Sequence, residues 1–156
     1  MKLKTLLLFL AFALCSLQGS FAKTIKVLAI GNSFSEDAIE QNLYELGKAA
    51  GDEFIIGNLY IGGCPLKKHW YNAENDKGAY RYRKINADGK LVQKDNIKIS
   101  AAIAEEDWDY ISLQQASGVS GLTESYEPYL AYLVAYIKTL APGSKIVWNQ
   151  TWAYSK

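Results

Sequence analysis

Two patterns of hydrophobic positions alternate along this chain. Short runs rich in apolar residues, typical of buried strands, occur at residues 25–31, 54–61, 108–114 and 145–151. Between them, stretches typical of helices occur at residues 35–50, 67–74, 100–106 and 126–140. Strands that alternate with helices in this way predict one domain of the α/β class, with a parallel sheet and helices on both of its faces.

The first predicted helix, residues 35–50, shows helical periodicity clearly. Ile39, Leu43 and Leu46 form an apolar stripe with spacings of four and three residues. Gly51 stands directly after the last helical residue, where a left-handed glycine ends many helices. The pattern predicts a continuous amphipathic helix.

Residues 79–99 differ in character from the rest of the chain. The alternating segment 80–85 is followed by a turn at 87–90, and apolar residues resume at Leu91. This pattern predicts a β-hairpin. We expect the hairpin to be an excursion from the main sheet.

The first 22 residues are predicted to be a secretory signal peptide. Lys2 and Lys4 precede an apolar run at residues 6–17, and the segment closes with a small-x-small pattern that ends at Ala22. The apolar run is shorter than the roughly 20 residues that a membrane span needs. We therefore expect cleavage after Ala22, a mature chain from Lys23, export to the periplasm or the medium, and no stable membrane anchor.

Charge and cysteine content narrow the choice of partner and fold type. The formal net charge is +1, and basic residues cluster only at residues 67–68 and 81–84, which argues against a nucleic-acid partner. Residues 23–156 contain one cysteine, Cys64, so an intramolecular disulfide framework is excluded. The domain must therefore be stabilised by an ordinary core.

The junction at residues 25–36 carries the clearest chemical signal. An apolar strand runs into Gly31-Asn32-Ser33, which places a serine at the carboxyl end of a parallel sheet, where open α/β folds bind ligands. A phosphate-binding turn would need more glycines and a lysine, and a nucleophile elbow would need a glycine at the position of Ser35. The remaining alternatives are a catalytic serine and a simple helix cap by Ser33 or Ser35.

Three predicted strand ends carry residues that suit acyl transfer. They are Gly31-Asn32-Ser33, Gly62-Gly63 and Gln114-Gln115-Ala116-Ser117. In a parallel sheet these ends converge at one edge. A serine, a glycine N–H and a side-chain amide at one place predict a site that stabilises a tetrahedral oxyanion.

With these blocks the sequence resembles the SGNH (GDSL-type) hydrolase superfamily. GNSF at 31–34 is similar to that family's first block, with Asn32 in place of the usual Asp. Gly62-Gly63 is similar to the second block, and Gln114-Gln115 stands where the family usually carries Gly-x-Asn-Asp. The segments YRYRKINADGK, WDYISLQQASG and IVWNQTWAY together look like an uncharacterised, exported bacterial branch.

The resemblance implies a flavodoxin-like sheet and a function. Ser33 would be the nucleophile of a serine ester hydrolase, acting on short acyl or acetyl esters of carbohydrate through an acyl-enzyme. The oxyanion would be held by the N–H groups of Ser33 and of Gly62 or Gly63, with the amide of Gln115. Further expectations are substrate contacts by Asn32 and Trp152, a small-molecule or glycan ester as the partner, and no metal or organic cofactor.

One departure from the family pattern is serious. The superfamily's Asp-x-x-His block supplies the base, whereas the single histidine here, His69, has Leu66 three residues before it. We therefore expect an N-terminal piece of a longer hydrolase that lacks the last strand and its helix and is inactive alone. The alternative is a non-catalytic carbohydrate-binding or interaction domain on the same scaffold.

A rival hypothesis uses Cys64, five residues before His69, as a thiolate nucleophile. The simpler interpretation is a buried or solvated cysteine beside a surface histidine near Trp70, since a nucleophile and its base usually come from distant segments. One cysteine and one histidine cannot complete a zinc site.

Overall fold

The computed structural model describes residues 23–151. The predicted signal peptide at 1–22 and Trp152 lie outside the described residues. The strands are β1 (Thr24–Gly31), β2 (Glu53–Tyr60), β3 (Tyr80–Ile85), β4 (Leu91–Ile97), β5 (Tyr110–Leu113) and β6 (Lys145–Trp148). The helical elements are α2 (Ser33–Ser35), the π-helical segment η1 (Glu36–Gln41), α3 (Leu43–Ala50), α4 (Leu66–Glu74), α5 (Ile99–Ile103), the 3₁₀ turns η2 (Ser117–Val119) and η3 (Thr123–Ser125), and α6 (Tyr129–Leu140).

Four neighbouring strands run parallel, in the order β2-β1-β5-β6. The central strand β1 aligns Leu28 with Gly57 of β2 and with Ile111 of β5. This is the order of the first four strands of a flavodoxin-like, doubly wound sheet. The prediction of an α/β fold with parallel strands is confirmed for this part of the sheet.

The hairpin of β3 and β4 departs from the prediction. β3 pairs antiparallel with β2, and β4 pairs antiparallel with β3, so the sheet is mixed, in the order β4-β3-β2-β1-β5-β6. The hairpin is therefore an extension of the main sheet at one edge, and the expected excursion is wrong. The cause is burial, since Tyr80 and Tyr82 of β3 are 0% and 1% exposed and join the core of the parallel strands.

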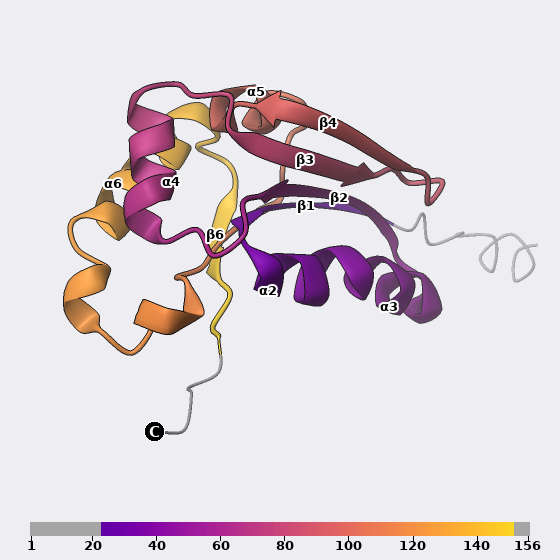
Figure 1. Cartoon of the computed structure of the whole chain (residues 1–156). Helices are drawn as coiled ribbons and strands as arrows, with labels where there is room; N and C mark the ends of the chain where they lie inside the picture. Colours follow the sequence, from indigo (N-terminus) through magenta and orange to yellow (C-terminus); the bar gives the residue numbers. More distant parts are fainter. Residues whose placement is uncertain (1–22, 152–156) are drawn as a thin grey trace, which may run out of the picture.

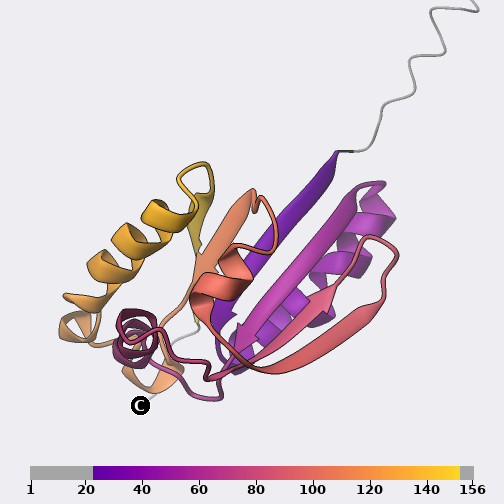
Figure 2. The same ribbon diagram turned by 90° about the horizontal axis from the view of Figure 1, so that it is seen from above.

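Helices cover both faces of the sheet, as Figures 1 and 2 show. On one face, η1 and α3 pack against β2. On the other face, α4, α5 and α6 enclose an apolar core with the strands, and its members include Leu28, Ile30, Leu59, Leu66, Ile99, Ile103, Ile111, Leu113, Leu133 and Ile137. Burial of this apolar surface is the main stabilising contribution to the fold. Within residues 23–151, no helix has the length and apolar character that crossing a bilayer requires.

The helix predicted at residues 35–50 is interrupted. After its first turn, α2, the chain passes into the π-helical segment η1 before α3 begins. The residues buried on the sheet side are Ser35, Glu40 and Gly47, whereas Leu46 of the predicted apolar stripe is 67% exposed. A π turn takes about one residue more than an α turn, which rotates the following residues around the helix axis.

The strand β6 forms an open edge of the sheet. Among the described strands it pairs only with β5. Its residues Val147 and Trp148 are 38% and 39% exposed, and the Trp148 ring lies beside that of Tyr126, with centroids 5.5 Å apart. An exposed apolar edge strand is a typical site for pairing with further polypeptide.

Candidate functional site

Ser33 lies at the carboxyl end of β1 and is exposed. The residue before it, Asn32, is the N-cap of α2, because its Oδ1 accepts the Phe34 N–H at 3.2 Å. Ser35 is buried, and its hydroxyl lies 2.7 Å from the Asn32 carbonyl oxygen. The capping role that we considered for Ser33 or Ser35 thus belongs to Asn32. The Ser33 hydroxyl makes no hydrogen bond with any residue from 23 to 151.

The turn after β2 lies beside this serine loop. The Cys64 N–H closes the turn on the Ile61 carbonyl at 3.2 Å, and Gly63 has a φ of +61°, which a residue with a side chain adopts at a cost. Within the described part of the chain, Gly62 and Gly63 donate no backbone hydrogen bond. Their N–H groups are therefore available to an external acceptor.

Two hydrogen bonds tie the serine loop to the glycine turn. The Ile61 N–H donates to the Gly31 carbonyl at 3.2 Å, and Asn32 Nδ2 donates to the Cys64 carbonyl at 3.2 Å. Asn32 is 1% exposed. The structure thus brings the first two predicted strand ends together, and the buried amide of Asn32 serves as the link rather than as an exposed substrate contact.

The end of β5 joins the same cluster through Gln114. Gln114 Nε2 donates a short hydrogen bond to Asn32 Oδ1. Gln114 Oε1 in turn accepts from Asn149 Nδ2 at 2.9 Å. Sequence reasoning missed Asn149 because the predicted strand 145–151 runs past it, whereas β6 ends at Trp148 and leaves Asn149 at the end of the strand. Hydrogen-bonded side-chain amides (Asn149, Gln114 and Asn32) therefore connect the carboxyl ends of β6, β5 and β1.

Gln115, the predicted oxyanion donor, has other partners. Its Nε2 donates to the carbonyl and to the hydroxyl oxygen of Ser125, both at 3.0 Å. Its Oε1 accepts the N–H groups of Leu66 at 3.0 Å and of Ala116 at 2.9 Å. The side chain is 1% exposed. Gln115 therefore holds neighbouring loops, and its amide is not free to stabilise an oxyanion.

His69 and Cys64 do not form a reactive pair. His69 is fully buried, its Nδ1 lies 2.9 Å from the Tyr80 hydroxyl, and burial lowers its pKa to about 3. Cys64 is 1% exposed, and burial raises the pKa of its thiol to about 12. The thiol therefore stays protonated at neutral pH. The imidazole is enclosed in the core, so the expected surface position of His69 is wrong. The structure gives no support to the thiolate hypothesis.

No base is hydrogen-bonded to the Ser33 hydroxyl within the described residues. The sequence contains one histidine, and its ring is buried against Tyr80. In addition, residues 23–151 contain no cluster of three or more His, Cys, Asp or Glu that could hold a metal ion. The described part of the site therefore offers a serine hydroxyl and free N–H groups, without a group that takes the serine proton.

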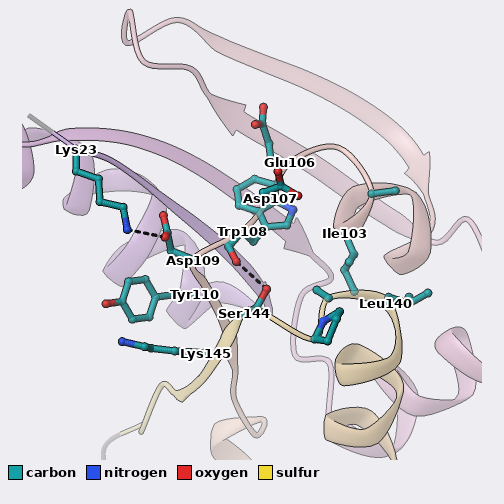
Figure 3. A pocket seen from close by; sticks show the side chains of 14 residues that line it. Lys23, Ile103, Glu106, Asp107, Trp108, Asp109, Tyr110, Leu140, Ser144 and Lys145 are labelled. Carbon is teal, nitrogen blue, oxygen red and sulfur yellow. Dashed lines mark hydrogen bonds and ion pairs between the residues drawn. The ribbon is translucent and has the colours of Figure 1, made fainter. Parts of the chain in front are cut away.

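A cavity of about 610 Å³ lies at the opposite edge of the sheet. Its lining includes Lys23, Tyr110 and Lys145, at the amino ends of β1, β5 and β6 (Figure 3). Several of its polar groups are already paired, such as Lys23 with Asp109 at 3.0 Å. Ligands of open α/β sheets bind at the carboxyl ends of the strands, so this cavity is separate from the Ser33 site.

Comparisons with known proteins identify the family but no activity. The chain is similar to the crystal structure of a DUF4886 family protein from Bacteroides uniformis ATCC 8492, with 51% sequence identity and a TM-score of 0.82. The similarity covers 85% of this chain and 51% of that one, so this chain spans about half the length of the solved relative. No curated protein matches. The model of the domain of unknown function DUF4886 matches residues 26–156, and the chain belongs to this family.

Proposed function

We propose that this domain belongs to an exported serine ester hydrolase of the SGNH type, with Ser33 as its nucleophile. The observation that carries the proposal is the exposed Ser33 on a loop that is hydrogen-bonded to the Gly62–Gly63 turn, whose N–H groups have no acceptor among the described residues. The Asn32 amide holds the two loops together at 3.2 Å from the Cys64 carbonyl. Short acyl or acetyl esters of carbohydrate are the proposed substrates, by analogy with the SGNH hydrolases that the sequence resembles.

In the proposed reaction, Ser33 Oγ attacks the ester carbonyl carbon and forms an acyl-enzyme, which water then hydrolyses. The N–H groups of Ser33 and of Gly62 or Gly63 would stabilise the tetrahedral oxyanion. The loss of one such donor raises the barrier by about 2.7–4 kcal/mol. No metal or organic cofactor takes part in this proposal.

The serine proton needs an acceptor from outside the described residues. We propose that a further segment pairs with the open edge of β6 and brings a histidine to Ser33. Two observations support this step: Val147 and Trp148 are exposed on β6, and the solved relative has about twice the matched length. On this view the described strands form the first part of a longer sheet, and this part alone does not turn over esters.

A non-catalytic carbohydrate-binding domain is the second candidate. It is favoured by the absence of a base beside Ser33 within the described residues and by exposed aromatic side chains. Tyr71 and Tyr132 are 50% and 48% exposed, and the Trp70 ring lies 5.0 Å from that of Tyr132. Aromatic rings of this kind suit contacts with sugars.

The test is turnover of 4-nitrophenyl acetate by a longer form that carries the segment proposed to cover β6. Ser33→Ala should lower kcat/KM by at least about a thousandfold, because the nucleophile is lost. A fluorophosphonate should label Ser33 in this longer form without substitutions. The Cys64→Ala variant should keep most of the turnover. Turnover that survives Ser33→Ala would refute the proposal, and glycan binding without any turnover would favour the second candidate.

A further inference from the structure

A row of buried polar side chains runs from the middle of β2 to the loop that carries Ser33. Its members are Glu40 of η1, Asn58 of β2 and Ser35 of α2, which are 5%, 0% and 0% exposed. Each lies on the face of the sheet that η1 and α3 cover. A buried carboxylate is costly, so this cluster calls for a physical explanation.

The members of this row follow one another at hydrogen-bond distance, and the one proton of the Ser35 hydroxyl can go to either of its two acceptors. Asn58 Nδ2 donates to Glu40 Oε2 at 2.9 Å. The Ser35 hydroxyl lies 2.9 Å from Asn58 Oδ1 and 2.7 Å from the carbonyl oxygen of Asn32. That same carbonyl accepts the Ser35 N–H at 3.0 Å. The row therefore ends on the peptide group that joins Asn32 to Ser33.

An ion pair holds the far end of the row. Glu40 Oε1 lies 2.8 Å from Arg83 Nε on β3. Arg83 also lies 3.3 Å from the carboxylate of Glu36, which Arg81 approaches to 3.2 Å. Two arginines of the hairpin thus face two glutamates of η1. These contacts fix the rotamer of Glu40 and, through it, the orientation of the Asn58 amide.

The π-helical segment places the Glu40 carboxylate and the Ser35 hydroxyl on the same side of the helix. Ser35 and Glu40 are five residues apart, which is the hydrogen-bonding interval of a π turn, and both are buried on the sheet side. Single π turns inside helices occur frequently at functional sites. A plain apolar interface would stabilise the helix with less desolvation cost, so its absence here favours a role other than stability.

We infer that Glu40 is a positioning residue for Ser33, acting through Asn58 and Ser35 on the Asn32 carbonyl. The inference rests on the proposed role of Ser33 and adds the group that holds it in place. Removal of the Glu40 carboxylate leaves the Asn58 amide without its acceptor and lets it turn. Ser35 then loses its oriented partner, and the Asn32–Ser33 peptide gains freedom.

The test compares Glu40→Ala, Glu40→Gln and Glu45→Ala in the full chain. Glu45 is exposed on α3 and serves as the matched control. Hydrogen exchange is measured for the amides of Phe34, Ser35 and Glu36, with amides of central β1 as the reference for global opening. The rate at which a fluorophosphonate labels Ser33 is measured in parallel, in the longer form that carries a base.

Glu40→Ala should speed exchange of the three loop amides about tenfold while the β1 amides keep their rates, and it should slow labelling of Ser33 by a similar factor. Glu40→Gln, which keeps one of the two oxygen acceptors and can therefore hold Asn58 but not Arg83 as well, should restore part of both, and Glu45→Ala should change neither. Unchanged loop exchange, or a rise shared equally by the β1 amides, would overturn the inference. If Ser33 labels in no variant, the proposed function fails, and the exchange rates alone decide whether Glu40 positions the loop.

Discussion

At the scale of single residues, His69 is a titratable group enclosed in the core. Its side chain is fully buried, Nδ1 is paired with the Tyr80 hydroxyl at 2.9 Å, and Nε2 has no hydrogen-bond partner among the described residues. Burial lowers the pKa of His69 from 6.5 to about 3. The folded chain therefore keeps the imidazole neutral at a pH at which the unfolded chain takes up a proton.

This difference predicts a loss of stability under mild acid. The contribution of neutral His69 is fully present above pH 6.5 and is lost progressively as the pH falls toward 3, because only the unfolded state binds the proton. Between pH 7 and pH 5.5 the free energy of unfolding should fall by about 1 kcal/mol. Urea unfolding at the two pH values measures this change.

The control for this prediction is His69→Gln, whose amide can still reach the Tyr80 hydroxyl but does not titrate. Its stability should be lower at pH 7 and nearly constant down to pH 5.5. The window stops there because Glu106 and Asp109, whose pKa values are lowered by their hydrogen bonds to Lys26, lose their own contributions in stronger acid. Equal pH dependence in the parent and in His69→Gln would show that His69 is not buried as described.

At the scale of elements, the sequence correctly predicts those strands whose bounds are set by local runs of apolar residues. The first two predicted strands, 25–31 and 54–61, agree with Thr24–Gly31 and Glu53–Tyr60 to within one residue. Apolar runs and the glycines that end them are local signals, and the meeting of the Ser33 loop with the glycine turn follows from the geometry of parallel strands.

Features that depend on tertiary contacts cannot be predicted from local sequence patterns. The strand that β3 pairs with is decided by the burial of its tyrosines, and the partners of Gln115 come from α4 and η3. The π turn is the clearest case, since the periodicity of residues 35–50 favours an unbroken helix. Tertiary hydrogen bonds to Asn58 and ion pairs to Arg83 outweigh that periodicity.

The same break in the helix gives a test of which face of α3 is buried. Leu46→Lys should change the free energy of unfolding by less than about 0.5 kcal/mol, because Leu46 is 67% exposed. Gly47→Ala should destabilise by about 1–3 kcal/mol, since a Cβ at this position would lie 2.2 Å from the Phe54 ring. Urea unfolding of both variants decides the matter. An unbroken helix with its apolar stripe inward would give the reverse order.

At the scale of the whole molecule, the two edges of the sheet differ. In β4, the exposed Leu91 and Val92 (48% and 43%) are followed by the polar residues at 93–96, which include Lys94. β6 is the last of the parallel strands and carries the exposed Val147 and Trp148, at the edge where a doubly wound sheet of this order would add its next strand. Unpaired N–H and C=O groups next to apolar side chains favour pairing with another chain.

Residues 23–156 produced alone should therefore self-associate through β6 and elute as a dimer or a larger species at about 100 μM. Val147→Lys combined with Trp148→Lys should shift the chain toward the monomer, since charged side chains on an edge strand oppose pairing. Leu91→Lys on β4 is the matched control and should leave the association unchanged. Analytical ultracentrifugation measures the association state of the unsubstituted chain and of the two variants. A parent chain that is monomeric at this concentration would show that the β6 edge is stable without a partner, and the proposal that a further segment covers it would lose its structural basis.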